Sequence, residues 1–417
     1  MDRLRARLSC CLVRGLHRLM HTQSAMMRTL LFLLAAAVIA QGRALAIDLG
    51  IDVLQSRDFD ILRGKHVGLV TNQTGVDNGG TKTRFILKKA LGANLVALFS
   101  PEHGLEGTAP AGAYVASRKD PATGLQVFSL HGPTRKPTTA MLKGIDTLVY
   151  DMQDIGVRSY TYISTMAKCM EAAGEAGIDF VVLDRPNPLG GDRVEGPGIE
   201  SKWLSFVGVF PVPYLHGMTS GELAQMANGR GWTSAKCKLT VIPMRGWNRG
   251  MTWNETGLRW IRTSPNIPNS DSPLYYAVTS MVGSLHGVDV GTGTPAPFSY
   301  LKGPGLNGSS LAERLQSAGY PGVNVSSIGN GVRLNINPKA DANLCKLGVQ
   351  LLCEANRAAS PTLFARYRDA DSIFWKVYGS TGIRSLAEEG TSAEKIASNW
   401  TGSVAAFRAA RRGYLLY

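Results

Sequence analysis

Short apolar runs alternate with amphipathic stretches along the chain between residues 47 and 250. The apolar runs have the length and the β-branched composition of buried strands, and they are His66–Val70, Leu95–Phe99, Val127–Leu130, Thr147–Tyr150 and Phe180–Leu183. Between them, Thr81–Leu91 and Tyr162–Ala176 have the period of helices that bury one face. Strands that alternate with helices predict βα units around a parallel sheet, so we expect an α/β domain here.

The pattern changes near Met251. Loops rich in glycine, proline and asparagine come first, and an alanine-rich helix follows near Asp341–Ala358. Ahead of this change, Thr219–Glu222 has the form of a capping box and predicts the start of a helix. A mature chain of about 370 residues is long for a single hydrophobic core. We therefore expect two domains, an α/β domain over residues 47–250 and a smaller α+β domain over residues 251–417.

An apolar run of twelve residues, Thr29–Ala40, follows several arginines near the N-terminus. The run is shorter than the roughly 20 apolar residues that span a bilayer. It is followed by Ala44-Leu45-Ala46, which has the small-x-small pattern of a signal-peptidase site. We therefore expect residues 1–46 to be a removable signal peptide and expect no stable membrane insertion. The true translation start is expected near Met26, downstream of Met1. The mature chain is expected to be exported to the periplasm or outside the cell.

Removal of this leader lowers the net charge. The sequence has 45 basic and 31 acidic residues, of which the leader holds seven and one, so the mature chain has 38 minus 30, or +8. A moderate positive charge favours weak attraction to an anionic cell wall. The mature chain has no Lys/Arg run interleaved with aromatic residues, so we do not expect nucleic acid as a partner. The charge pattern does not identify a protein partner.

Polar residues follow the proposed strands. Ligands of open α/β sheets bind outside the carboxyl ends of the strands. The polar side chains at these positions are Asn72, Glu102, His103, Asp151, Gln153, Asp154, Arg158, Tyr160, Asp184, Arg185 and Asn187, and a later apolar stretch leads to His216. A single such residue is more often a helix cap or a hydrogen-bonded structural residue. Together they predict a polar active-site cleft along one edge of the sheet.

Missing motifs narrow the chemistry. The strand ends lack GxGxxG and GxSxG, and the chain lacks HExxH, which disfavours a dinucleotide cofactor, an α/β-hydrolase nucleophile and a zinc protease. None of the mature chain's four cysteines belongs to a CxxC pair. Carboxylates are plentiful, and glycoside hydrolysis needs one carboxyl group as an acid and a second as a base or nucleophile. We expect neither a cofactor nor a metal ion.

At these residues the sequence resembles the NamZ-like exo-β-N-acetylmuramidase family. The motifs that carry the resemblance are Ser100–Gly104, Tyr150–Arg158, Asp184–Pro188, Val194–Pro197, His216–Thr219, Ser264–Pro268 and the closing Arg411–Tyr417. The resemblance implies a Rossmann-like N-terminal domain, a smaller C-terminal domain and a cleft between them. It also implies release of N-acetylmuramic acid from the non-reducing end of peptidoglycan-derived saccharides.

The resemblance and the strand-end positions together predict roles for single residues. Glu102 matches the glutamate proposed as catalytic in the family, and we predict that it is the general acid. Asp151, at the end of a strand, is the predicted second carboxylate or the group that orients the acetamido arm of the sugar. The predicted substrate-binding residues are Asn72, His103, Gln153, Asp154, Arg158, Tyr160, Asp184, Arg185, Asn187, Glu195, His216 and Asn266.

One segment departs from the family pattern. Where the family has Glu-Gly-Thr-Asn and then Gly-Arg-Gly-Thr, this chain has Ser284–Gly287 and Gly291–Thr294. The missing arginine is a natural partner for the lactyl carboxylate of muramic acid, and Arg185, or else Arg158, is predicted to replace it. Two alternatives stay open. One is a sugar-binding relative without turnover, and the other is a hydrolase whose divalent metal is held by Asp151, Asp154, Asp184 and His103.

Overall fold

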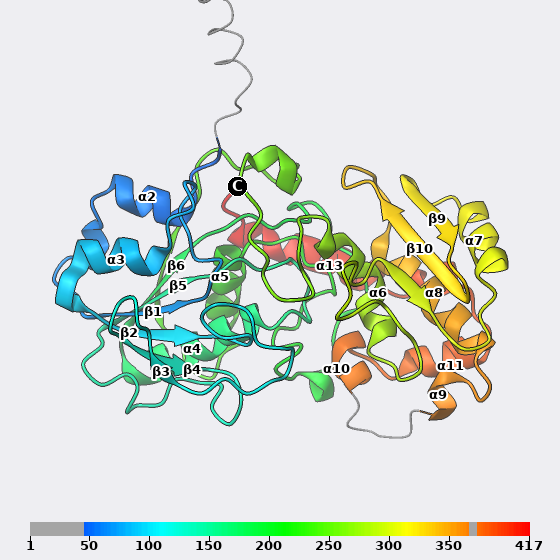
Figure 1. Ribbon diagram of the computed structural model, residues 1–417, viewed down its shortest axis with the longest axis horizontal. Helices are drawn as coiled ribbons and strands as arrows, with labels where there is room; N and C mark the ends of the chain where they lie inside the picture. Colours follow the sequence, from blue (N-terminus) through cyan, green and yellow to red (C-terminus); the bar gives the residue numbers. More distant parts are fainter. Residues whose placement is uncertain (1–45, 367–372) are drawn as a thin grey trace, which may run out of the picture. The chain divides into compact units, whose positions relative to one another are not determined.

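Seven strands form the central sheet of the computed structural model, which describes residues 46–366 and 373–417 (Figure 1). The order across the sheet is β3-β4-β2-β1-β5-β6-β7, and every neighbouring pair is parallel except β3 and β4. The strands are β1 (Val67–Thr71), β2 (Leu95–Ser100), β3 (Arg118–Lys119), β4 (Gln126–Ser129), β5 (Thr147–Asp151), β6 (Asp179–Leu183) and β7 (Lys238–Ile242). The predicted parallel sheet is confirmed.

The parallel strands, numbered among themselves along the chain, lie in the order 3-2-1-4-5-6 of the Rossmann fold. The direction of winding therefore reverses between β1 and β5, and a crevice at this point is the usual ligand site of such sheets. The apolar pattern did not predict β7. This strand lies at the edge of the sheet, and exposed residues such as Lys238 and Thr240 alternate with less exposed ones, so it has no continuous apolar run.

Both faces of the sheet are covered, as the period-2 alternation of a doubly wound sheet requires. Leu69 and Val181 pack with residues of α2 (Gly50–Ser56) and α3 (Thr83–Leu91) in one cluster. Their neighbours Val70 and Val182 belong to a second cluster, with residues of α4 (Tyr162–Ala176) and α5 (Ser220–Arg230). Thr219 caps α5 through its side chain, as the capping box predicts.

The second domain has a three-stranded antiparallel sheet with helices packed against it, which confirms the predicted smaller α+β domain. Its strands, in the order β8-β10-β9, are β8 (Tyr300–Lys302), β9 (Val323–Ser327) and β10 (Gly331–Ile336). Its helices are α6 (Ser272–Gly283), α7 (Gly308–Ser317), α8 (Leu344–Ala358), α9 (Leu363–Arg366), α10 (Ile373–Tyr378), α11 (Gly382–Glu388) and α12 (Ala393–Ser398). The predicted alanine-rich helix is α8, which begins after the capping side chain of Asn343.

Single turns of 3-10 helix connect several of these elements. Within the described ranges they are Asp60–Leu62, Gly92–Asn94, Ser201–Trp203, Trp253–Thr256 and Arg412–Tyr414.

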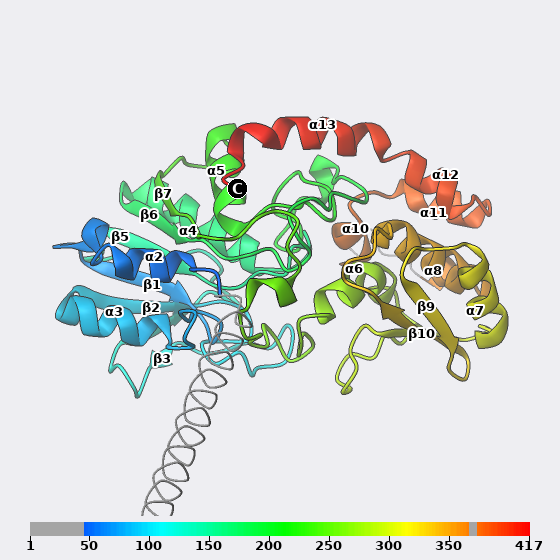
Figure 2. The same cartoon turned by 90° about the horizontal axis from the view of Figure 1, so that it is seen from above.

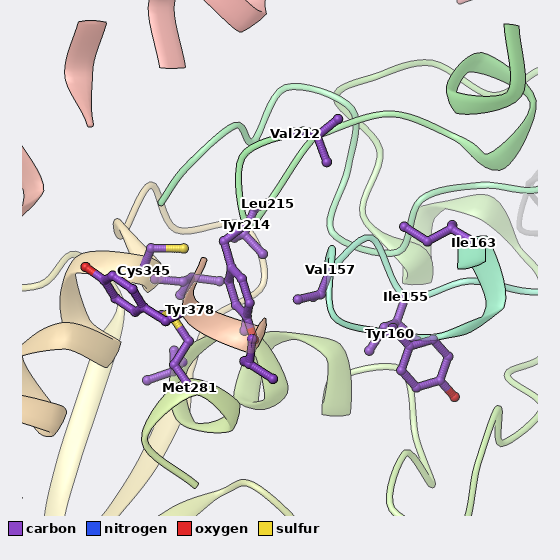
Figure 3. Packing of buried hydrophobic residues seen from close by; sticks show 14 of the residues in the cluster. Ile155, Val157, Tyr160, Ile163, Val212, Tyr214, Leu215, Met281, Cys345 and Tyr378 are labelled. Carbon is purple, nitrogen blue, oxygen red and sulfur yellow. The ribbon is translucent and has the colours of Figure 1, made fainter. Parts of the chain in front are cut away.

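The end of the chain ties the two domains together. Helix α13 (Thr401–Arg411) carries the chain from the second domain back to α5 (Figure 2). There the Tyr417 hydroxyl donates to Asp184 Oδ2 over 2.8 Å. One hydrophobic cluster also runs through both domains, and it includes Tyr214 of the first and Cys345 and Tyr378 of the second (Figure 3). Residues 47–417 therefore form one compact unit.

The predicted signal peptide falls outside the described residues. Within residues 46–366 and 373–417, no helix combines the length and the apolar character needed to cross a bilayer. The four cysteines of this part, Cys169, Cys237, Cys345 and Cys353, are buried free thiols.

Candidate active site

The loops that follow β1, β5 and β6 are joined by hydrogen bonds at one edge of the sheet. The backbone N–H of Gln153, after β5, donates to the Thr74 hydroxyl after β1 over 2.9 Å. The Gln153 side chain donates to the carbonyl oxygen of Pro186, after β6, over 2.8 Å. The convergence that parallel strands predict is therefore present, and it brings polar side chains from distant segments together.

Glu102 follows β2 at the same edge, and its carboxylate is held from two sides. Oε1 accepts from the Gly112 N–H over 2.8 Å, and Oε2 accepts from the Thr161 hydroxyl over 2.7 Å. His131 Nε2 lies 3.9 Å from Oε1. The Glu102 side chain is 12% exposed, so it is enclosed but open enough to meet a ligand.

The environment of Glu102 favours its ionised form. Burial by itself would raise the pKa, but the hydrogen bonds from Gly112 and Thr161 outweigh it, helped by the His103 and His131 imidazoles. The pKa of Glu102 therefore lies below its ordinary value. A general acid must carry a proton, so the predicted acid role would require substrate binding to raise this pKa. As it stands, the carboxylate is suited to act as a base or a nucleophile.

His103 shapes the loop that carries Glu102. Its backbone has φ of 70°, in the left-handed region that side chains other than glycine seldom adopt. Its Nδ1 lies 2.7 Å from the carbonyl oxygen of Ala109, a contact that closes the loop on itself. The predicted role of His103 in substrate binding stays a prediction, and the geometry gives it a role in positioning the loop.

Three tyrosine rings contact one another near Glu102, and burial together with the negative charge of Glu102 raises the pKa of Tyr162 and of Tyr276. The rings of Tyr160 and Tyr162 meet edge to face at 4.9 Å between centroids, and Tyr276 lies 6.0 Å from Tyr160. The Tyr160 hydroxyl donates to Thr263 Oγ1 over 2.7 Å, and the Tyr162 hydroxyl donates to the Thr263 carbonyl oxygen. Aromatic faces and hydroxyl groups of this kind suit a sugar ring.

Asp154 is the carboxyl group that the fold keeps protonated. Burial raises its pKa to about 7, although Oδ2 accepts a hydrogen bond from the Gly156 N–H over 2.7 Å. Its Oδ1 is buried without a partner among the described residues. Burial raises the pKa of Tyr276 to about 12, and the Glu102 and Asp154 carboxyl groups add to this rise when they are ionised, so both lie within electrostatic reach of this hydroxyl. Two carboxyl groups with opposite pKa shifts near one point are typical of acid–base sites.

The raised pKa of Asp154 predicts a pH-dependent stability. Because the folded-state pKa is above the unfolded value of about 3.9, Asp154 contributes stability that is complete below about pH 4 and lost as the pH rises through about 7. We expect Asp154→Asn to gain stability relative to wild type between pH 4.5 and 8, by up to about 4 kcal/mol. Urea unfolding at both pH values measures this change. Asp179, whose pKa is lowered, is the control: above about pH 4.5 it is ionised in both the folded and the unfolded state, so the effect of Asp179→Asn should hardly change between pH 4.5 and 8.

Asp151 does not present a free carboxylate. Its side chain is fully buried, and Oδ1 and Oδ2 accept from Arg185 Nε over 2.6 Å and from Arg185 Nη2 over 2.9 Å. Oδ2 also accepts from the Thr83 hydroxyl. These contacts direct the carboxylate toward Arg185 and Thr83, and its assignment as the second catalytic carboxylate stays a prediction. Its role in this structure is to position Arg185.

The part of the chain that the structure describes brings no three His, Cys, Asp or Glu side chains together as a metal site. Asp151 is paired with Arg185, and Asp184 is bound to Thr219 over 2.7 Å. Two of the four ligands suggested for a metal-dependent hydrolase, Asp151 and Asp184, are therefore bound to separate partners.

Two family models match the chain, described as the N-terminal part of exo-β-N-acetylmuramidase NamZ over residues 67–271 and its C-terminal part over residues 274–417. The peptidoglycan β-N-acetylmuramidase NamZ of Bacillus subtilis (strain 168) is 38% identical over 386 residues, which cover 88% of this chain and 91% of that protein. This chain belongs to the NamZ family. The resemblance seen in the sequence motifs is confirmed.

Two crystal structures of DUF1343 family proteins from Bacteroides fragilis NCTC 9343 have the same fold. One is 40% identical, with a TM-score of 0.82, and covers 90% of this chain and 100% of its own. The other is 30% identical, with a TM-score of 0.69, and covers 89% of this chain and 99% of its own. The agreement over nearly the whole length includes both domains described above.

Arg158 lies in a NamZ-family motif, and its side chain is bound to backbone carbonyl oxygens. The side chain is fully buried. Nη1 donates to the carbonyl oxygens of Pro197 and Val212, and Nη2 donates to those of Val377 and Tyr378, over 2.7 to 2.9 Å. Burial lowers the pKa of Arg158 to about 10. These contacts join the two domains through backbone carbonyls, and the role of Arg158 in substrate binding stays a prediction.

Asp184 also has a structural place. It is fully buried, and its oxygens accept from the Arg185 and Gly221 N–H groups and from the Thr219 and Tyr417 hydroxyls. Burial raises its pKa to about 6. These contacts fix the start of α5 and hold Tyr417, and the role of Asp184 in substrate binding stays a prediction.

Glu195 and His216 hold other parts of the fold. Glu195 pairs with Arg193 over 2.7 Å and accepts from the Cys345 N–H at the start of α8 over 3.2 Å. His216 is fully buried, and its Nδ1 accepts from the Met218 N–H. Burial lowers the pKa of His216 to about 3, with help from the charge of Arg411, so the ring is neutral. These contacts give both residues a structural role, and their roles in substrate binding stay predictions.

The three predicted asparagines lie in different surroundings. Asn72 accepts from Thr74 through Oδ1, while its Nδ2 is buried without a partner among the described residues. Asn187 donates to the Met218 carbonyl oxygen and packs against Gly156, where an added Cβ would lie 2.1 Å from its Oδ1. Asn266 is the amide that reaches the segment departing from the NamZ-family pattern, because its Oδ1 accepts from the Gly293 N–H over 2.9 Å.

Three residues around Glu102 were not predicted from the sequence, namely His131, Thr161 and Tyr276. Thr161 directly follows Tyr160 in the loop after a strand, so this position was an available signal. Tyr276 lies in α6 of the second domain, and no local pattern distinguishes it from a core aromatic residue.

Proposed function

We propose that this chain is an exo-acting glycosidase that releases N-acetylmuramic acid from the non-reducing end of peptidoglycan fragments. Its membership of the NamZ family and its identity to the B. subtilis peptidoglycan β-N-acetylmuramidase support this activity. The observation that carries the proposal is the Glu102 carboxylate, enclosed by Gly112 and Thr161 at the carboxyl edge of the sheet.

In the proposed reaction, Glu102 acts as a carboxylate on the anomeric side of the sugar. Its hydrogen bonds with Gly112 and Thr161 fix its orientation and keep it ionised at neutral pH. Asp154, whose pKa is raised to about 7, is protonated in a substantial fraction of the molecules at neutral pH, as the donor to a leaving alcohol must be. The hydroxyl of Tyr276 lies within electrostatic reach of both carboxyl groups. This division of roles replaces the expectation that Glu102 alone supplies the acid.

We also propose that the protein acts outside the cytoplasm. The support is the apolar run Thr29–Ala40 followed by Ala44-Leu45-Ala46, which has the form of a cleavable leader. The net charge of +8 after cleavage is suited to work at an anionic wall. N-terminal sequencing of the protein recovered from the culture or the periplasm tests this proposal, with Ile47 as the expected first residue.

The activity is tested with two chromogenic glycosides, one of N-acetylmuramic acid and one of N-acetylglucosamine. We expect release of the chromophore from the muramic acid glycoside, unaffected by EDTA, and much slower release from the other. Release from neither, with measurable binding of N-acetylmuramic acid, would instead indicate a sugar-binding relative without turnover. Loss of release in EDTA would indicate the metal-dependent alternative.

A further inference from the structure

A pocket lies where the winding of the sheet reverses, between the carboxyl ends of β1 and β5. Its volume is about 540 Å³, and Gln73 and Thr74 after β1 and Gln153 after β5 line it. The segment Trp253–Pro268 supplies the opposite wall. Ligands of doubly wound sheets bind at such a reversal, so the position of the pocket is that of a binding site. Glu102 is not among its lining residues.

One wall of the pocket is a buried cation with a free donor. The Arg185 side chain is 4% exposed, and it lines the pocket. Its Nε and Nη2 are bound to Asp151 and to the carbonyl oxygen of Val76, which fixes the plane of the guanidinium group. Among the described residues Nη1 has no hydrogen-bond acceptor. It is not one of the fully buried polar atoms that lack a partner, so solvent can reach it. A rigid, unpaired N–H donor is suited to an anionic oxygen.

The rim of the pocket adds positive charge. Arg259 and Arg262 are exposed lining residues, and neither pairs with an acidic side chain within the described ranges. Lys82 also lines the pocket but is paired with Glu106 over 2.7 Å. Asp77 is the acidic lining residue, and its Oδ1 accepts from the Thr81 N–H. The charges left without an opposite partner are therefore mostly positive, which favours an anionic ligand.

Two indole rings and two amides give the pocket its remaining chemistry. Trp253 and Trp260 line it and meet edge to face at 4.7 Å between centroids. Gln73 and Gln153 each have a buried Oε1 without a partner among the described residues. Aromatic rings beside amide groups are suited to a sugar or a short peptide, both of which have apolar faces and polar edges.

The pocket and the Glu102 site share a wall. Gln73, which lines the pocket, donates through Nε2 to the carbonyl oxygens of Arg262 and Thr263, each over 2.9 Å. The same Thr263 carbonyl oxygen accepts from the Tyr162 hydroxyl, and Thr263 Oγ1 accepts from the Tyr160 hydroxyl. Burial and the negative charge of Glu102 raise the pKa of Tyr162, so Thr263 and Tyr162 connect the pocket with the surroundings of Glu102.

We propose that this pocket is a subsite for a carboxylate of the peptidoglycan fragment, bound by Arg185 Nη1 with Arg259 at the rim. This inference rests on the proposed function, because it assigns the pocket to the same substrate. The carboxylate has two sources, the lactyl group of muramic acid itself or the peptide that is attached to the lactyl group. Both present the same planar anion to a guanidinium group.

The test measures kcat and KM of Arg185→Lys and Arg259→Gln on three chromogenic glycosides. These are N-acetylmuramic acid, N-acetylmuramic acid with a dipeptide amide-linked to its lactyl group, and N-acetylglucosamine. Lysine keeps a charge opposite Asp151 but cannot also donate into the pocket, so we expect KM to rise about 10- to 100-fold on the substrate whose carboxylate is bound. Arg259→Gln should raise the same KM about two- to fivefold. Arg333→Gln, on exposed β10, is the matched control and should change neither constant.

The pattern across substrates decides the outcome. If KM rises only for the N-acetylmuramic acid glycoside, the pocket binds the lactyl carboxylate. If KM rises only for the dipeptide-linked glycoside, the pocket binds the peptide carboxylate. Equal changes on all three glycosides, or none in either variant, would overturn the subsite. If wild-type protein cleaves no glycoside, the proposed function fails separately. Calorimetric titration of wild-type protein and Arg259→Gln with N-acetylmuramic acid, its dipeptide conjugate and N-acetylglucosamine then decides the subsite, and an equal affinity of wild-type protein for all three would overturn it.

Discussion

Glu102→Gln is expected to lower kcat on a muramic acid glycoside by about 10²- to 10⁴-fold, the loss typical of removing an acid or base group. The amide cannot act as a base or a nucleophile, and it cannot supply a proton. Its oxygen can still accept from Gly112 or Thr161, so the loop should keep its place. The expected change in KM is therefore small. Steady-state kinetics and thermal unfolding of the purified variant measure both effects.

The control for this experiment is Glu175→Gln, which makes the same chemical change on the surface of α4. It should keep full activity. If Glu102→Gln retained near-wild-type kcat while folding normally, Glu102 would have no part in the reaction, and the acid–base pair would have to be sought elsewhere around the tyrosines.

Arg158→Met is expected to have the largest effect on stability. The substitution removes the donors to the carbonyl oxygens of Pro197, Val212, Val377 and Tyr378, which are contributed by both domains. A buried acceptor without a partner costs about 1–3 kcal/mol, and relief from burying a charge offsets part of the sum. We expect the free energy of unfolding to fall by about 3–5 kcal/mol.

Urea unfolding followed by tryptophan fluorescence measures this loss. Arg333→Met, an exposed position on β10, should stay within about 0.5 kcal/mol of wild type. A loss below about 1 kcal/mol for Arg158→Met would mean that water or a shifted side chain satisfies the carbonyl oxygens, and that the two domains do not depend on this residue.

The sequence by itself determined the architecture of the first domain. Its strands are short apolar runs that are buried on both faces. Such runs can be predicted from the local sequence alone, without knowing which elements pack against them. The helix Tyr162–Ala176 appears with the predicted limits because its apolar period and its terminal Gly177 are local signals. The edge strand β7 was missed because an exposed edge needs no such pattern.

The sequence also located the site in outline. Parallel strands must end on the same edge, so residues that follow β1, β2, β5 and β6 were expected to meet, and they do. The family motifs singled out Glu102 within this set, and the structure encloses its carboxylate at that edge.

The tertiary structure decides which of those residues have internal partners and which face a ligand site. A strand-end arginine or aspartate looks the same in sequence whether it faces a ligand or an interior partner. Arg158 and Arg185 differ because backbone carbonyls bind both terminal nitrogens of the first, whereas Asp151 and Val76 leave Nη1 of the second, beside the pocket, without an acceptor in the described part of the chain. The pKa values of Glu102 and Asp154 depend likewise on burial and on donors such as Thr161. Contacts between residues distant in sequence set these energies, because hydrogen bonds and desolvation depend on distance in space rather than along the chain.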